Sequence, residues 1–169
     1  AANFAKFDKA AKYTDFRKML DAEQKNIDAV LIATPDFMHG TQAMWSIERG
    51  KHVYVQKPMT RTGWEARQLK AAALKYKVAT QMGNQGYCQE GTRVAAEMVW
   101  SGAIGNVTEC HCWTNRPVWP QGFAVVPDEQ ATPDFMDWEK WVGISEMRRY
   151  SPAYAPFSWR GFYDFGCGS

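Results

Sequence analysis

The feature that most constrains the fold is a regular alternation of two kinds of segment over residues 15–83. Apolar residues recur at helical spacing in three segments, each followed by a short apolar run: 15–24 then 28–34, 37–50 then 52–56, and 61–77 then 78–83. Helices alternating with buried strands at this spacing are typical of a parallel sheet with helical crossovers. The sequence therefore predicts an α/β fold, with Thr14 as the N-cap of the first helix.

The rest of the chain has a different character. A further helix is predicted at about Glu90–Trp100, and "VTECHCWTN" (107–115) is predicted to be a longer strand. From residue 116 onward the chain is rich in Pro, Trp, Tyr and Phe, whereas disordered segments are poor in aromatic residues. We expect long ordered loops that cover a sheet face. Their aromatic rings suit either a ring-shaped polar ligand or plain packing.

Composition excludes several classes of function. The chain has 169 residues, 46% of them hydrophobic and 22% charged, with a net charge of +2 and no basic or acidic run. These values match an ordinary globular protein and give no reason to expect a nucleic acid or an anionic membrane as a partner. No apolar run reaches the length of a membrane span. The functions that remain are chemistry on a small molecule and contacts with another protein.

The four cysteines do not form a metal motif. Cys88, Cys110, Cys112 and Cys167 include no C-x-x-C pair. In the predicted strand, Cys110 and Cys112 share one face and His111 lies on the other, which disfavours a common metal ion. We therefore predict no metal site and reduced thiols in the core.

The stretch "VYVQKPMT" (53–60) ends a predicted strand with a lysine and a proline. Proline cannot donate to a sheet ladder, so Lys57 is expected at the carboxyl end of the strand. In open parallel sheets, ligands bind outside these strand ends. A solvated lysine is the alternative interpretation, because many strand-terminal lysines have no chemical role.

A family resemblance narrows these alternatives. The segment from Val30 to Gly86 resembles the nucleotide-binding half of the Gfo/Idh/MocA oxidoreductases, which include glucose-fructose oxidoreductase and inositol dehydrogenase. The "ATPD" turn, the "GKHV" segment leading to "KP", and "TQMGNQG" follow in the family's order, and "WTNRPVWPQG" and "SPAYAPFSWRGFYDFGCGS" resemble a sugar-acting branch. The resemblance implies part of a Rossmann domain, a doubly wound parallel sheet, over residues 1–84. It implies the beginning of an α+β open-sheet substrate domain over 85–169, with NAD or NADP in the cleft between them.

The resemblance also gives Lys57 a role. The family has Glu-Lys-Pro where this chain has Gln56, Lys57 and Pro58, and its lysine lies between nicotinamide and substrate. Lys57 is then expected to polarise a substrate hydroxyl or carbonyl and to take part in acid–base chemistry. Gln56 departs from the family's acidic residue near the nicotinamide ribose. An amide in place of a carboxylate would weaken cofactor binding by about 1–2 kcal/mol.

Further positions carry over from the same resemblance. The expected cofactor-binding residues are Thr34, Pro35, His39, Gln56, Lys57, Pro58, Asn84 and Gln85. His39, on the first turn of a helix, is equally well explained as a structural residue. On the substrate side, arginines offer a rigid donor fork and tryptophan a flat face for a sugar ring, and the expected residues are Arg116, Trp119 and Arg160.

The glycine-rich phosphate loop G-x-G-x-x-G does not occur in the chain. The family places that loop upstream of residue 1 and its acid–base Asp and His downstream of "DFGCGS". We therefore expect the chain to be a fragment of a longer protein. By itself the fragment is expected to be inactive and not a stable monomer. The complete protein is expected to be a homo-oligomer.

Three functions fit the sequence. The first is an NAD(P)-dependent oxidoreductase that moves a hydride between a CH–OH group of a sugar-like substrate and nicotinamide. The second is a glycosidase or lyase that oxidises a sugar transiently and then returns the hydride. The third is a non-catalytic binding homologue, for which Gln56 is the sequence support.

Overall fold

The computed structural model describes residues 5–115, 123 and 125–167. Its centre is a parallel sheet of three strands in the order β1-β2-β3: β1 (Ala29–Ile32), β2 (His52–Gln56) and β3 (Thr80–Gly83). The register places Val30 beside Val53, and Val53 beside Thr80. The predicted parallel α/β arrangement is confirmed.

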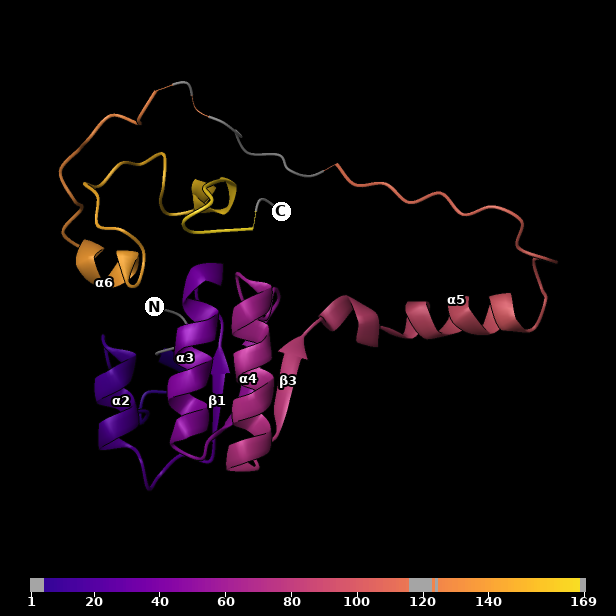
Figure 1. The fold of residues 1–169 in the computed structure, drawn as a ribbon, viewed down its shortest axis with the longest axis horizontal. Coiled ribbons are helices and arrows are strands. Elements are labelled where there is room, and N and C mark those ends of the chain that lie inside the picture. Colours follow the sequence, from indigo (N-terminus) through magenta and orange to yellow (C-terminus); the bar gives the residue numbers. More distant parts are fainter. Residues whose placement is uncertain (1–4, 116–122, 124, 168–169) are drawn as a thin grey trace.

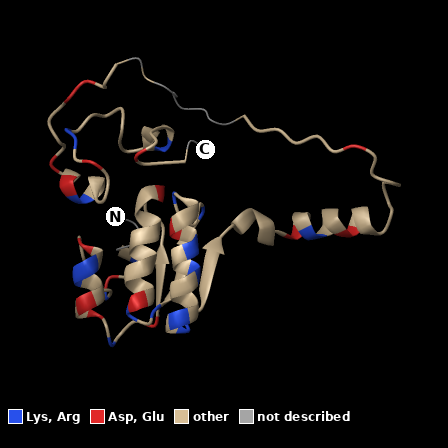
Figure 2. Ribbon diagram, viewed as in Figure 1, with Lys and Arg blue, Asp and Glu red and all other residues tan. Residues whose placement is uncertain are grey.

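Three helices alternate with the strands and lie side by side along the sheet (Figure 1): α2 (Phe16–Ala22), α3 (Asp36–Glu48) and α4 (Gly63–Tyr76). Helix α3 carries acidic residues only at its two ends, as Figure 2 shows, and is the most buried of the three. It packs against β1, β2 and α4. The shared apolar core consists of Ile32, Ala43, Ile47, Val53, Val55, Leu69 and Ala72.

Local signals fix the helix ends. Thr62 and Glu65 form a capping box at the start of α4, where each side chain accepts a hydrogen bond from the backbone N–H of the other residue. The N-cap of α2 is Asp15, so the prediction of Thr14 is wrong by one residue. The Asp15 carboxylate accepts the N–H of Arg17 at 2.9 Å and also binds the Arg17 guanidinium, which together favour Asp15 as the cap.

After β3 the chain leaves the sheet. A short 3-10 helix η1 (Gln85–Cys88) leads to α5 (Glu90–Trp100), which has no buried residue and projects away from the sheet (Figure 1). The predicted helix at Glu90–Trp100 is confirmed. The predicted strand at 107–115 is wrong, since these residues are extended and exposed without strand pairing. A strand needs a hydrogen-bonding neighbour, and the described part of the chain supplies none here. The substrate domain predicted over 85–169 remains a prediction.

Residues 133–167, which we call the aromatic cap, return to the sheet and helices. The cap contains α6 (Trp138–Val142) and the 3-10 helix η2 (Ser158–Gly161). Its aromatic residues form a second core with Phe37 and Met38 of α3, through Trp138, Tyr150, Tyr154, Trp159 and Phe165. The cap thus covers the first turn of α3 and not a sheet face as predicted, because its rings pack around Phe37, which is fully buried.

The four cysteines are all exposed, so the prediction that they lie in the core is wrong. Cys88 follows the sheet, and Cys110 and Cys112 lie in the exposed segment after α5, where nothing packs over them in the described residues. Within the described ranges, no group of three or more His, Cys, Asp or Glu side chains could hold a metal ion. No helix in those ranges is both long enough and apolar enough to cross a bilayer.

Candidate active site at the carboxyl edge of the sheet

The loops that follow the three strands meet at one edge, because the strands are parallel. The turn after β1 carries Thr34 and Pro35, the loop after β2 begins with Lys57 and Pro58, and the segment after β3 begins with Asn84. Carboxyl ends of parallel strands are where open α/β sheets bind ligands. The structure therefore brings the predicted residues of three separate loops to a single edge, with Gln85 next to Asn84.

The predicted cofactor residues at this edge differ in exposure. Thr34, Lys57, Asn84 and Gln85 are exposed, whereas Pro35, Gln56 and Pro58 are half-buried. Gln56 lies against Gly83 at the end of β3, where a Cβ atom on residue 83 would overlap the Gln56 side-chain oxygen. Glycine at position 83 therefore leaves the room that the Gln56 amide occupies.

His39 lies underneath this edge, in the first turns of α3. Its side chain is 1% exposed. Its Nδ1 is 2.6 Å from the carbonyl oxygen of Pro58, and its Nε2 is 2.8 Å from the carbonyl oxygen of Thr34. Both ring nitrogens are thus occupied by protein carbonyls. This arrangement fits the structural alternative for His39 better than a direct contact with a cofactor.

Asp36 is a member of the site that the sequence patterns did not reveal. It is the first residue of α3 and only 6% exposed. Burial raises the pKa of its carboxyl group, while His39, the backbone N–H of Cys167, Lys57 and Arg160 act in the opposite direction. The residue before it is Pro35, so its place on a helix N-terminus was predictable. Its burial was not predictable, because it depends on the aromatic cap.

The aromatic cap brings Arg160 to the same edge, where its charge acts on Asp36. The Arg160 guanidinium stacks over the rings of Phe157 and Trp159, 4.2 Å from each centroid. Arg61, in the loop after β2, donates to the carbonyl oxygen of Asp164 at 2.8 Å and ties that loop to the cap. Of the predicted substrate residues, Arg116 and Trp119 lie outside the described residues.

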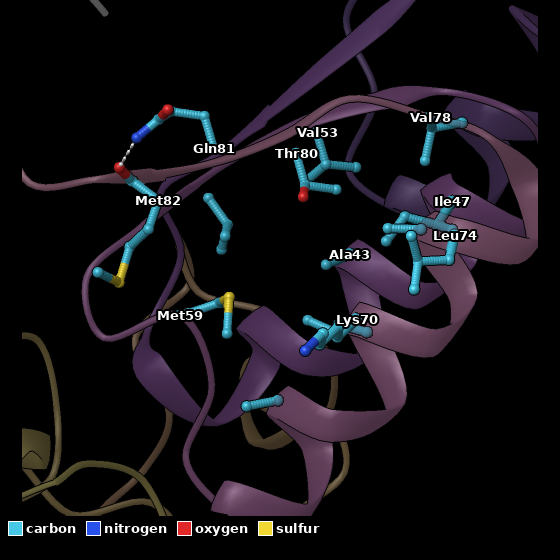
Figure 3. Close-up of a pocket in the computed structure, with 14 residues that line it drawn as sticks. Ala43, Ile47, Val53, Met59, Lys70, Leu74, Val78, Thr80, Gln81 and Met82 are labelled. Carbon is cyan, nitrogen blue, oxygen red and sulfur yellow. Dashed lines mark hydrogen bonds between the residues drawn. The ribbon is translucent and has the colours of Figure 1, made fainter.

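Two hollows lie near these elements. One of about 360 Å³ lies between α3, α4 and the sheet and has mostly apolar walls that include Ala43, Ile47, Val53 and Leu74 (Figure 3). It contains none of the predicted site residues. The other, of about 1000 Å³, lies between α2, α3 and the cap, and Thr34 and Pro35 form part of its wall. The second hollow is therefore the one that adjoins the candidate site.

Comparison with known proteins identifies the fold. The family model GFO_IDH_MocA, described as an oxidoreductase family with an NAD-binding Rossmann fold, matches residues 1–84. Residues 1–84, just under half of the chain, are therefore similar to the Gfo/Idh/MocA oxidoreductase family. The partial Rossmann fold and the family resemblance predicted from the sequence are both confirmed, and the family is an NAD-binding one.

Relatives of known name agree with this assignment. Levoglucosan dehydrogenase of Pseudarthrobacter phenanthrenivorans is 29% identical over 56% of this chain and 24% of its own length. Inositol 2-dehydrogenase of Rhodococcus erythropolis is 30% identical over 59% of this chain and 29% of its own. The chain spans about a quarter of the length of the curated relatives it matches.

A solved structure is similar over a comparable share of the chain. The inositol dehydrogenase homologue of Azotobacter vinelandii, complexed with NADH and myo-inositol, has a TM-score of 0.51 and 28% sequence identity. The match covers 56% of this chain and 26% of that one. The similarity therefore supports the Rossmann fold.

Proposed function

We propose that the whole protein is an NAD(P)-dependent oxidoreductase that transfers a hydride between nicotinamide and a carbon-bound hydroxyl of a sugar, polyol or glycoside. The observation that carries the proposal is the position of Lys57. It lies exposed at the carboxyl end of β2, between the turn that contains Thr34 and the segment that begins at Asn84. The names of the similar levoglucosan and inositol dehydrogenases support a sugar-like substrate.

The residues at the edge fit a dinucleotide. The amides of Gln56, Asn84 and Gln85 offer both donors and acceptors, which suits ribose hydroxyls and a carboxamide. Thr34 and Pro35 present a turn close to the same edge, where the backbone can approach the cofactor. When bound, the nicotinamide supplies the hydride acceptor or donor. These five residues would hold it, in either the NAD or the NADP form.

Lys57 acts on the substrate. Its ammonium group donates a hydrogen bond to the reacting oxygen and stabilises the negative charge that develops there as the C–H bond breaks. Arg160, at the same edge, supplies a donor fork for substrate hydroxyls or a carboxylate. We assign Arg116 and Trp119 to the same substrate side from the sequence alone.

The complete protein is proposed to be a homo-oligomer, which light scattering of the purified protein tests.

A second candidate is a lyase or glycosidase that uses transient oxidation. It is favoured by a similarity to 2,7-anhydro-N-acetylneuraminate hydratase of Escherichia coli, which is 28% identical over 59% of this chain and 27% of its own length. Both candidates share the first hydride transfer. Net NADH formation during turnover supports the dehydrogenase, whereas product release without net NADH and with catalytic amounts of NAD supports the second candidate.

The test of the proposal is Lys57→Ala in the full-length protein. Loss of the positioned ammonium group should lower turnover at least about a hundredfold while the NAD dissociation constant changes little. Lys25→Ala is the matched control, because Lys25 is exposed and precedes β1 at the opposite edge of the sheet. Unchanged turnover in Lys57→Ala removes Lys57 from the mechanism, and poor NAD binding with intact turnover makes it a cofactor anchor.

A further inference from the structure

The His39 ring has an unusual pair of partners. Both of its nitrogens lie within hydrogen-bonding distance of backbone carbonyl oxygens, 2.6 Å for Pro58 and 2.8 Å for Thr34. A carbonyl oxygen only accepts hydrogen bonds, and a neutral imidazole donates from one nitrogen alone. A neutral ring would therefore place the lone pair of its other nitrogen directly against a carbonyl oxygen.

We propose that His39 is held as an imidazolium ion and that it acts as a positioning residue, which fixes the Lys57 loop relative to the cofactor turn. In this form both nitrogens donate, and both bonds are charge-assisted. The inference deepens the proposed function, and its kinetic test rests on that function.

The surroundings of His39 supply a counter-charge. Asp36, one helical turn earlier on α3, is 6% exposed, and it lies near enough to the His39 ring that a positive charge on the ring would lower its pKa. Glu65 of α4 lies against Gly40, where its Oε1 is 3.1 Å from the place that a Cβ atom on residue 40 would occupy. Lys57 and, from the cap, Arg160 contribute positive charge near Asp36, and Cys167 donates its backbone N–H to it. A buried cation with a buried carboxylate beside it is compensated.

The two carbonyl groups show which loops the His39 ring holds in place. Thr34 belongs to the turn after β1 that is proposed to contact the cofactor, and Pro58 directly follows Lys57. The His39 ring therefore bridges the two loops whose separation sets the distance between cofactor and lysine. Displacement of a reacting group by about 1 Å can cost a hundredfold in rate, so a residue that bridges these loops can control turnover without touching the substrate.

His52 provides a contrast within the same chain. Its Nδ1 accepts a hydrogen bond from the backbone N–H of Ala79 at 2.9 Å, which requires that nitrogen to be unprotonated. His52 is exposed and lies at the amino end of β2, away from the candidate site. It is therefore a matched control both for the charge of the ring and for the effect of a His→Gln substitution.

The charge is tested by histidine-selective ¹⁵N labelling of the full-length protein and NMR at neutral pH. We expect His39 to show two protonated ring nitrogens and His52 to show one. An unprotonated nitrogen in His39 overturns the imidazolium. This measurement uses the wild-type protein and requires neither substrate nor activity, so it stands even if His39→Gln does not fold or the proposed reaction is wrong.

The positioning role is tested by His39→Gln and His52→Gln. Glutamine at position 39 cannot bridge both carbonyls, so we expect kcat to fall about ten- to a hundredfold while the NAD dissociation constant changes less than about threefold. His52→Gln should change neither value. Full turnover in a folded His39→Gln protein overturns the positioning role. Absence of sugar or polyol turnover in the wild type contradicts the proposed function instead, and the NMR result then still decides the charge of His39.

Discussion

The sheet with its helices and the aromatic cap are ordered by different kinds of information. In the first region, buried residues recur with the period of a helix or a strand, so that Ala43 and Ile47 of α3 face Val53 and Val55 of β2. In the cap, the buried rings follow no period and meet only because distant segments fold together on Phe37. The first core is encoded locally, and the second depends on contacts between residues far apart in the sequence.

Phe37→Ala should have the largest effect on stability, because Phe37 joins the two regions. Its ring is fully buried and lies 5.3 Å from the Phe165 ring and 5.7 Å from the Trp141 ring, measured between centroids. Removal of a buried phenylalanine side chain costs about 3–5 kcal/mol of unfolding free energy. Urea unfolding of the full-length protein measures this loss. Phe7→Ala, at an exposed phenylalanine, is the control and should change little.

Gly166→Ala should separate the two regions with a smaller effect. A Cβ atom on residue 166 would lie 2.5 Å from the backbone oxygen of Arg160, and backbone cannot move aside as a flexible side chain can. Overpacking of this kind costs about 1–3 kcal/mol. We expect the near-ultraviolet signal of the cap tryptophans to change while the helical signal persists. Gly86→Ala, where a Cβ atom meets nothing within 4 Å, should leave both signals unchanged.

Thr62→Ala should affect the helices by about 1 kcal/mol, the usual cost of losing an N-cap hydroxyl. The substitution removes the hydroxyl that accepts the Glu65 N–H and leaves the aromatic cap untouched. Thr62→Ser keeps the hydroxyl and should recover most of the loss in a urea titration. Equal destabilisation by both substitutions would show that the capping box does not stabilise α4.

The same difference explains how far the sequence predicts the candidate site. The position of Lys57 followed from the end of an apolar run and a proline, both local signals. The burial of Asp36 did not, because the cap residues that interact with it, Arg160 and Cys167, lie more than a hundred positions away in the sequence. The segment expected to be a strand at 107–115 contains residues that favour strands, such as Val107, Thr108 and Trp113. Pairing, however, needs a neighbouring strand that a single segment cannot specify.

His39 lies between these extremes. Its place on the first turns of α3 was predictable from the helical pattern, and its partners were not. Both hydrogen bonds join it to carbonyls of other loops, and backbone carbonyls leave no trace in the amino-acid sequence. A residue type can be read from a motif, whereas its partners require the folded chain.

The smallest effects concern pH, and two aspartates should show opposite signs. The Arg17 side chain and backbone hold the pKa of Asp15 below its ordinary value, so its contribution to stability is present above the unfolded pKa and is lost as the pH falls. Burial raises the pKa of Asp36, so the folded state binds a proton more readily than the unfolded state, and stability should rise as the pH falls from neutral through that raised pKa.

Urea titrations of the full-length protein between about pH 3 and about pH 7, the range in which carboxyl groups titrate, test the sign of both effects on stability. Asp15→Asn should reduce the loss of stability on acidification, because the variant has no carboxylate to protonate. Asp36→Asn should make that loss steeper, because it removes a group that takes up a proton on folding. Arg17 is largely exposed, so the Asp15 effect should be small. Slopes that change in the same direction in both variants would show that the cap does not keep Asp36 out of water.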